Sequence, residues 1–154
     1  MGELAPLLYR SPRALKRFVN VYRLLKASLR PADRFDYLDA TKAPPHHEVV
    51  LFLLAVTVGM PSVSRAFFEE VAVYTDDIPD KDAPPADLGE LLARMDRSAP
   101  DPSKIAGVAW AEEMARIRGW LSARPSKRPF NPHLPQLGYW ARRVSRFTYR
   151  VNRW

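Results

Sequence analysis

Five polar residues near the amino terminus recur at the spacing of one helix face: Arg13, Lys16, Arg17, Asn20 and Arg23. On a helix, the last four lie within about 80° of the first. Arg13 falls in the first turn, where the positive end of the helix dipole disfavours a cation by about 0.3–1 kcal/mol. A phosphate bound beside it would offset that cost. The spacing predicts either an anion site or a solvated basic face, and both interpretations stay open.

The carboxy-terminal stretch carries a second set of cations that could meet phosphate. An apolar stripe at i, i+4, i+7, i+11 and i+14 predicts a basic amphipathic helix, with a strand through "FTYRV" as the alternative. Rings interleaved with arginines can stack on bases, although helical spacing favours packing in the core. The stripe consists of Trp140, Val144, Phe147, Val151 and Trp154, and the cations around it are Arg142, Arg143, Arg146, Arg150 and Arg153.

Other arrangements that could carry chemistry are weak. The run His46, His47 and Glu48 lacks a second histidine one helical turn after His47, so no metal site is predicted. The acidic pairs at 69–70 and 112–113 point about 100° apart on a helix, which favours a solvated face over acid–base catalysis. The six glycines form no phosphate-cradling loop. We therefore predict no catalytic residue in this chain.

Composition and charge narrow the class of protein. The 154 residues include no cysteine, which excludes disulfides and zinc–thiolate sites and favours the cytoplasm. The longest apolar run, residues 49–60, is about half the ~20 residues that span a bilayer, so no membrane span is predicted. Residues 1–30 hold seven basic residues and one acid, and residues 124–154 hold eight basic residues and none. These basic ends are suited to an anionic partner.

Helix signals begin with Ser11 as an N-cap and Pro12 at the first helical position, which predict a helix ending near Leu29. Its predicted apolar stripe is Leu15, Phe18, Val19, Tyr22, Leu25 and Leu29. The run from His47 to Val58 is apolar on nearly every side and predicts a buried helix that ends at Gly59.

Further helices are expected after Pro61, around residues 88–95 and from Asp101–Pro102 onward. The segment 75–87 is an acidic connector, and residues 124–136 form a linker or wrapping arm because four prolines cannot sit inside a helix. The predicted inward faces are Val63, Phe67, Val71 and Tyr74, then Leu88, Leu91, Leu92 and Met95, then Trp110, Met114, Ile117 and Leu121.

These elements predict an all-α fold, a compact bundle of about five to seven helices with proline-rich connectors. Residues 1–123 are expected to form one helical domain. Residues 124–154 are expected to add a proline-rich linker and a basic helix that packs on the same domain.

The stretch "SPRALKRFVNVYRLLKA" resembles the start of the helical region that follows the nucleotide-binding core in KAP-type and STAND-like bacterial P-loop NTPases. The closing "VSRFTYRVNRW" is similar to the way those proteins end. The resemblance implies a lid or regulatory module on an ATPase core that binds ATP and magnesium. It places Arg13 and Arg17 at the nucleotide phosphates, and Asn20 and Arg23 at the contact between lid and core.

One departure from that family is large, because no G-x-x-x-x-G-K-[ST] motif is present. The chain is therefore expected to be a carboxy-terminal fragment, a split subunit or a relic, without activity alone. Its expected partner is an NTPase core in the same or another chain, and self-association is a further expectation. The alternatives are a helical module that binds nucleic acid through its basic ends and a purely structural scaffold subunit.

Overall fold

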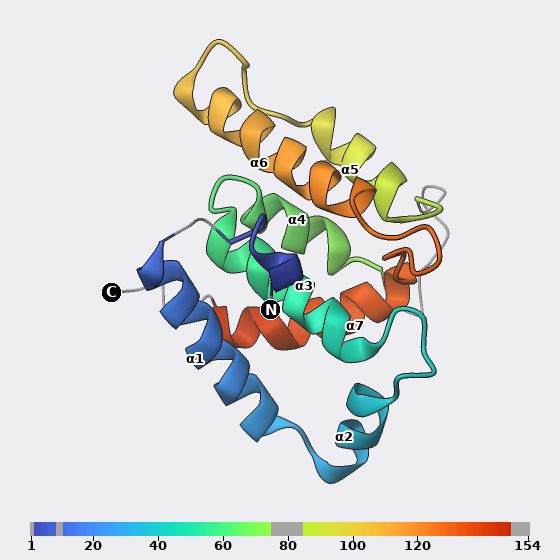
Figure 1. Cartoon of the computed structure of the whole chain (residues 1–154). Coiled ribbons are helices and arrows are strands. Elements are labelled where there is room, and N and C mark those ends of the chain that lie inside the picture. Colours follow the sequence, from blue (N-terminus) through green and yellow to red (C-terminus); the bar gives the residue numbers. More distant parts are fainter. Residues whose placement is uncertain (1, 9–10, 75–84, 149–154) are drawn as a thin grey trace.

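A computed structural model describes residues 2–8, 11–74 and 85–148, and within them every regular element is helical (Figure 1). A short 3-10 helix, η1, spans Gly2–Leu4. The α-helices are α1 (Pro12–Ser28), α2 (Pro31–Leu38), α3 (His46–Gly59), α4 (Ser64–Val71), α5 (Leu88–Asp96), α6 (Ile105–Ser122) and α7 (Leu134–Thr148). The predicted all-α architecture is confirmed.

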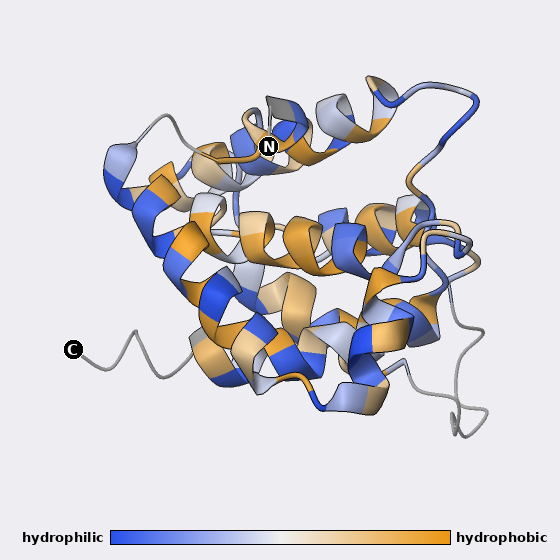
Figure 2. Ribbon diagram, turned by 60° about the horizontal axis from the view of Figure 1, so that its bottom comes forward, coloured by the Kyte–Doolittle hydropathy of each residue, from blue (hydrophilic) through white to orange (hydrophobic). Residues whose placement is uncertain are grey.

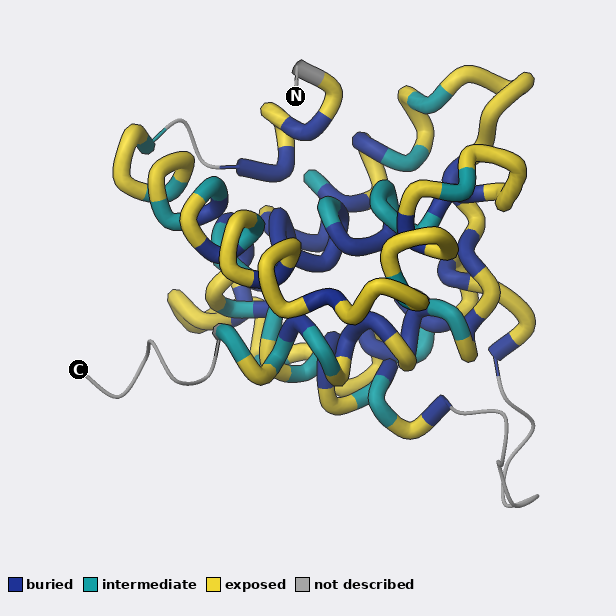
Figure 3. Tube along the Cα trace, turned by 90° about the horizontal axis from the view of Figure 1, so that it is seen from below, coloured by how far each residue is buried: buried dark blue, intermediate teal, exposed yellow. Residues whose placement is uncertain are grey.

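Helix α3 lies at the centre of the molecule and packs against α1, α2, α4 and α7. Its sequence is apolar on nearly every side, so it can be surrounded, and eight of its residues are buried. Helix α7 crosses the same region and also contacts α1 and α4. Figure 3 shows the buried part of the chain gathered in this middle layer, with exposed segments around it.

Helices α5 and α6 lie side by side at the edge of the molecule away from α1 and α2 (Figure 1). An ion pair between Arg118 and Asp96 joins them. Helices α1, α2, α4, α5 and α7 are amphipathic, and Figure 2 shows hydrophobic and hydrophilic residues alternating along the ribbons. The predicted inward residues of α5 are all buried, as are Val63, Phe67 and Val71 around α4.

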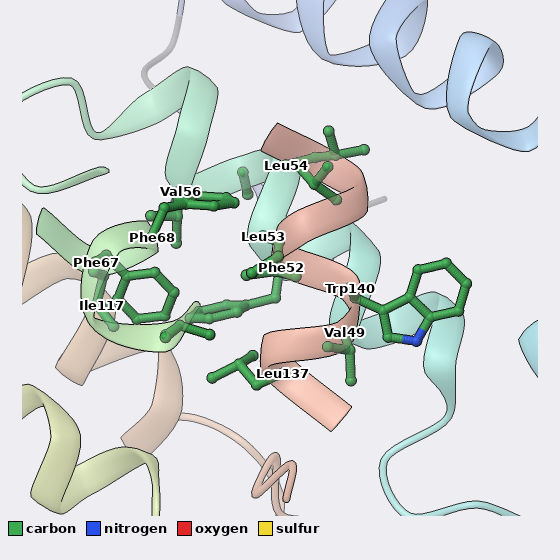
Figure 4. Packing of buried hydrophobic residues seen from close by; sticks show 14 of the residues in the cluster. Val49, Phe52, Leu53, Leu54, Val56, Phe67, Phe68, Ile117, Leu137 and Trp140 are labelled. Carbon is green, nitrogen blue, oxygen red and sulfur yellow. The ribbon is translucent and has the colours of Figure 1, made fainter. Parts of the chain in front are cut away.

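Aromatic rings fill the core between α3, α4 and α6 (Figure 4). Phe52 is fully buried, with ring centroids of Phe67, Trp120 and Phe130 at 5.9, 5.3 and 4.9 Å. Phe130 comes from the proline-rich connector, so this segment wraps over the core. Three of its prolines lie in the connector, whereas Pro135 lies in the first turn of α7, where a missing N–H costs nothing. The prediction that all four lie outside a helix was wrong.

Two other predicted details were wrong. Leu15 of the predicted α1 stripe is 47% exposed, and Val21, which was not predicted, is buried. The buried face of α1 is thus rotated toward the side of Val21. Asp101 and Pro102 precede α6 instead of starting it, because the Asp101 carboxylate accepts hydrogen bonds from the Ser103 N–H and hydroxyl at 2.9 and 2.7 Å, which holds a turn.

Glu113 was predicted to lie on a solvated face, but it is buried and joins α6 to the corner between α3 and α4. Its Oε2 accepts the backbone N–H groups of Ser62 and Val63, both at 2.9 Å. One turn later, Arg116 donates to the carbonyl of Gly59 at 3.0 Å. The carboxylate of Glu113 thus lies at the start of α4, and the guanidinium of Arg116 lies at the end of α3. Each charge is opposite in sign to the helix-dipole end beside it, which is favourable.

Candidate phosphate-binding surfaces

The predicted basic residues of α1 lie where the helical spacing placed them, with one exception. Arg13, Lys16, Asn20 and Arg23 are exposed and form what we call the α1 basic face. Arg17 is half-buried, with its Nε enclosed. Among the described residues, no carboxylate lies within ion-pair distance of Arg13, Lys16 or Arg23. The α1 basic face is therefore available to an anionic partner.

The first turn of α1 offers few backbone donors to such an anion. Ser11 caps the helix by accepting the N–H of Ala14 at 3.5 Å, as predicted from its position. Pro12 has no N–H, and no acidic residue is present in this turn. A phosphate at this end would therefore be bound chiefly by side chains such as that of Arg13.

The predicted carboxy-terminal cations divide into two groups. Arg142, Arg143 and Arg146 lie on α7, whereas Arg150 and Arg153 are outside the described residues. So are Val151 and Trp154 of the predicted stripe. The described members of this stripe are buried or half-buried, so this side of α7 faces the core; they are Trp140, Val144 and Phe147.

The three described arginines of α7 line a groove of about 510 Å³ against the end of α1 and the start of α2. We call it the basic groove. Its apolar wall comes from α1 and α7, and Arg30 and Asp33 come from the α1–α2 junction. The lining is Leu25, Ser28, Leu29, Arg30, Asp33, Tyr139, Trp140, Arg142, Arg143, Arg146 and Phe147.

Arg143 is held in place within the basic groove. Its Nη1 lies 3.1 Å from the Asp33 carboxylate, and its guanidinium stacks over Tyr139 at 4.4 Å. The hydrogen bond from Arg143 holds the pKa of Asp33 below its ordinary value. Arg142 donates to the carbonyl of Ala72 at 3.2 Å. Arg30 and Arg146 have no carboxylate within ion-pair distance among the residues described here.

A second hollow, of about 310 Å³, adjoins the groove because both are lined by Asp33, Tyr139 and Trp140. We call it the polar pocket. Its other lining residues are Asp36, His46, Pro135 and Gln136. Trp140 donates its Nε1–H to Nδ1 of His46 at 2.7 Å, which places the imidazole proton on Nε2. The polar pocket therefore offers hydrogen-bond acceptors next to a cluster of cations.

His46 gives this region a pH dependence. Burial, followed by the positive charge of Lys42, lowers the pKa of His46 below 6.5, against the opposing effect of Asp36 and Asp39. The unfolded chain therefore takes up the proton first as the pH falls. The stability that His46 supplies is complete above pH 6.5 and is lost as the pH falls below it.

We therefore expect the urea concentration at the midpoint of unfolding to fall when the pH is lowered from about 7.5 to about 5.5. This fall should be larger for the unmodified protein than for His46→Gln. A glutamine oxygen can still accept from Trp140 but does not titrate. An equal fall in both proteins would contradict the role assigned to His46. Circular dichroism during urea unfolding measures the difference.

The run His46, His47 and Glu48 does not converge on one point. His46 meets Trp140, whereas Glu48 pairs with Arg124 at 3.0 Å on another side of α3. In the part of the chain that the structure describes, no three His, Asp or Glu side chains are grouped so as to hold a metal ion. No helix in these ranges has the length and apolarity needed to cross a membrane.

Two charged residues of the basic groove were not predicted. Arg30 follows α1, and Asp33 lies in the first turn of α2, where an acid is ordinary. Their part in the groove depends on α7, more than a hundred residues later, and periodicity within one helix carries no signal for that contact. In the comparisons with known proteins, no family model, no curated protein and no solved structure matches this chain.

Proposed function

We propose that this chain is a helical lid or regulatory module of a P-loop NTPase, and that the α1 basic face docks on the nucleotide-binding core. The observation that carries the proposal is the exposed cationic side of α1, which no carboxylate of the described residues pairs, at a helix start that has no acid. The resemblance of residues 11–27 to the region following such cores supplies the class of partner. The core, with its ATP and magnesium, would belong to the same longer chain or to another subunit.

In this proposal Arg13 contacts the terminal phosphates of the bound nucleotide. An arginine beside a phosphate forms charge-assisted hydrogen bonds that are about twice as strong as neutral ones. Arg17 is one turn further along and half-buried, so it supports this contact from the border of the hydrophobic interior of the helical module. Asn20 and Arg23 continue the exposed face and would hold the module against the core. Docking then depends on whether the nucleotide carries its terminal phosphate.

We expect Arg13→Ala to lower the nucleotide-dependent activity of the complete assembly by about 10-fold or more, because a charge-assisted contact is lost. The melting temperature without nucleotide should stay nearly unchanged, since Arg13 is exposed. The assembly to assay is this chain together with the core encoded in frame or in an adjacent gene. ATP hydrolysis by the purified chain alone should stay at background.

Arg97→Ala is the matched control, because Arg97 is exposed at the end of α5, far along the chain from α1. It should leave the activity unchanged. Equal and small losses in the two variants, both reduced by salt, would indicate binding through overall charge and favour the nucleic-acid alternative. ATP hydrolysis by the chain alone that Arg13→Ala abolishes would also contradict the proposal.

A further inference from the structure

We propose that the basic groove and the polar pocket form one binding site for a nucleotide unit, either free or within a single strand of nucleic acid. The phosphate would lie in the groove and the base or ribose at the pocket. The two hollows share Asp33, Tyr139 and Trp140, so one ligand can reach both. Their volumes, about 510 and 310 Å³, are in the range of small-molecule sites.

The charge of the groove favours phosphate over a carboxylate ligand. Four arginines line it against a single acid, Asp33. Asp33 already pairs with Arg143 and fixes the orientation of its guanidinium. Arg30 and Arg146 are exposed and bring positive charge that no described carboxylate neutralises. A phosphate group, with nearly two negative charges and several acceptor oxygens, matches such a set of planar donors.

The apolar wall of the groove favours a ligand that is more than an ion. Leu25 of α1 and Leu29 just after it are buried on the side of the groove that faces the core, and the half-buried Phe147 lines the same side. The Tyr139 ring is 43% exposed between the two hollows. A free phosphate would leave the Tyr139 ring and the exposed part of Phe147 uncovered, whereas the ribose or base of a nucleotide can cover them.

The residues of the polar pocket narrow the class of ligand further. The carboxylates of Asp33 and Asp36 line it, paired with Arg143 and Lys42 at 3.1 and 3.7 Å, and their remaining lone pairs can accept hydrogen bonds. A base amino group or a ribose hydroxyl donates to such groups, as in the recognition of base edges by acidic side chains. Gln136 and His46 add polar atoms to the same hollow. A cationic groove beside an acceptor-rich pocket thus fits a ligand with an anionic end and a donating end.

This site is separate from the α1 basic face. The groove uses Leu25 of α1 and Leu29 just after it, which are buried on the side toward the core, together with the exposed Ser28. Arg23, two residues before Leu25, points about 160° away around the helix. Arg13 is about 18 Å before Leu25 along the axis, at 1.5 Å per residue. Nucleotide binding in the groove therefore does not depend on docking through Arg13.

The test measures binding of three probes to the purified full chain: ATP, a fluorescent single-stranded oligonucleotide of deoxyadenosines, and inorganic pyrophosphate. Arg146→Gln should weaken whichever nucleotide probe binds by about 10-fold, because it removes one phosphate contact. Asp36→Asn should weaken the same probe by about 3-fold to 10-fold and leave pyrophosphate binding unchanged or tighter. Tight binding of ATP identifies a free nucleotide as the ligand, and binding of the oligonucleotide alone identifies a strand.

Arg97→Gln is the control for charge, since it removes the same charge at an exposed site outside the groove. Arg13→Gln should leave groove binding intact, so the two proposals fail separately. Equal, small, salt-dependent losses in Arg146→Gln and Arg97→Gln would overturn this inference, as would pyrophosphate binding as tight as ATP and unaffected by Asp36→Asn. Absence of binding by every probe at 1 mM would overturn it too. Circular dichroism melting checks that each variant is folded.

Discussion

Phe52→Ala is expected to lower the free energy of unfolding by about 3–5 kcal/mol, the usual cost of removing a fully buried phenylalanine. Phe52 comes from the central helix α3 and meets rings from α4, α6 and the proline-rich connector. No single neighbour can close the space, because the rings around it are held by three different elements. The loss would be a large share of the 5–15 kcal/mol that typically stabilises a domain.

Phe35→Ala is the matched control for this prediction. Phe35 lies on α2 and is 82% exposed, so its truncation should change the free energy of unfolding by no more than about 0.5 kcal/mol. Urea unfolding followed by tryptophan fluorescence and circular dichroism measures both variants. A loss below about 1 kcal/mol for Phe52→Ala would contradict the central position of the ring.

Most of the helices were predictable because their signals are local, but α2, which begins at Pro31, was not predicted. Ser11, Pro12 and the apolar periodicity that follows were enough to place α1, and its observed bounds agree with the expected ones. The run 47–58 was recognisable as a buried helix because it is apolar on nearly every side. The periodicity of each helix also identified most of its inward face. These features depend only on residues within one or two turns of each other.

Contacts between distant elements explain what the sequence did not reveal. Leu15 fits the periodicity of α1 but is exposed, because α1 turns the side of Val21 toward the neighbouring helices. Glu113 has the composition of a surface residue, and only the position of the α3–α4 corner gives its carboxylate two backbone donors. The basic groove likewise depends on where α7 crosses α1 and α2. Such relations have no short-range pattern.

The fold also connects the two hollows of the proposed nucleotide site. Trp140 is fully buried on α7, and its indole N–H reaches His46 at the start of α3. The next turn of α7 carries Arg143, which reaches Asp33 of α2. Packing of α7 on α3 therefore sets the position of the groove arginines relative to the acceptors of the polar pocket.

Glu113→Ala is expected to lower the free energy of unfolding by about 2–4 kcal/mol, because two backbone N–H groups at the start of α4 lose their partner away from water. The carboxylate is itself buried, and burial raises its pKa above the ordinary value, against the opposing effect of these hydrogen bonds. A buried polar group is retained at little cost only when it is paired, as Glu113 is. Glu113→Gln keeps one acceptor oxygen in the same place and should cost about 1 kcal/mol.

Glu112 provides the control, because it is adjacent in sequence and exposed on a side of α6 about 100° away from Glu113. Glu112→Ala should change the free energy of unfolding by no more than about 0.5 kcal/mol. Hydrogen exchange adds a local readout, since the amides of Ser62 and Val63 should lose protection in Glu113→Ala more than the amides of α1 do. Equal effects of the 112 and 113 alanine variants would contradict the capping role, because a solvated carboxylate at either position would then account for both results.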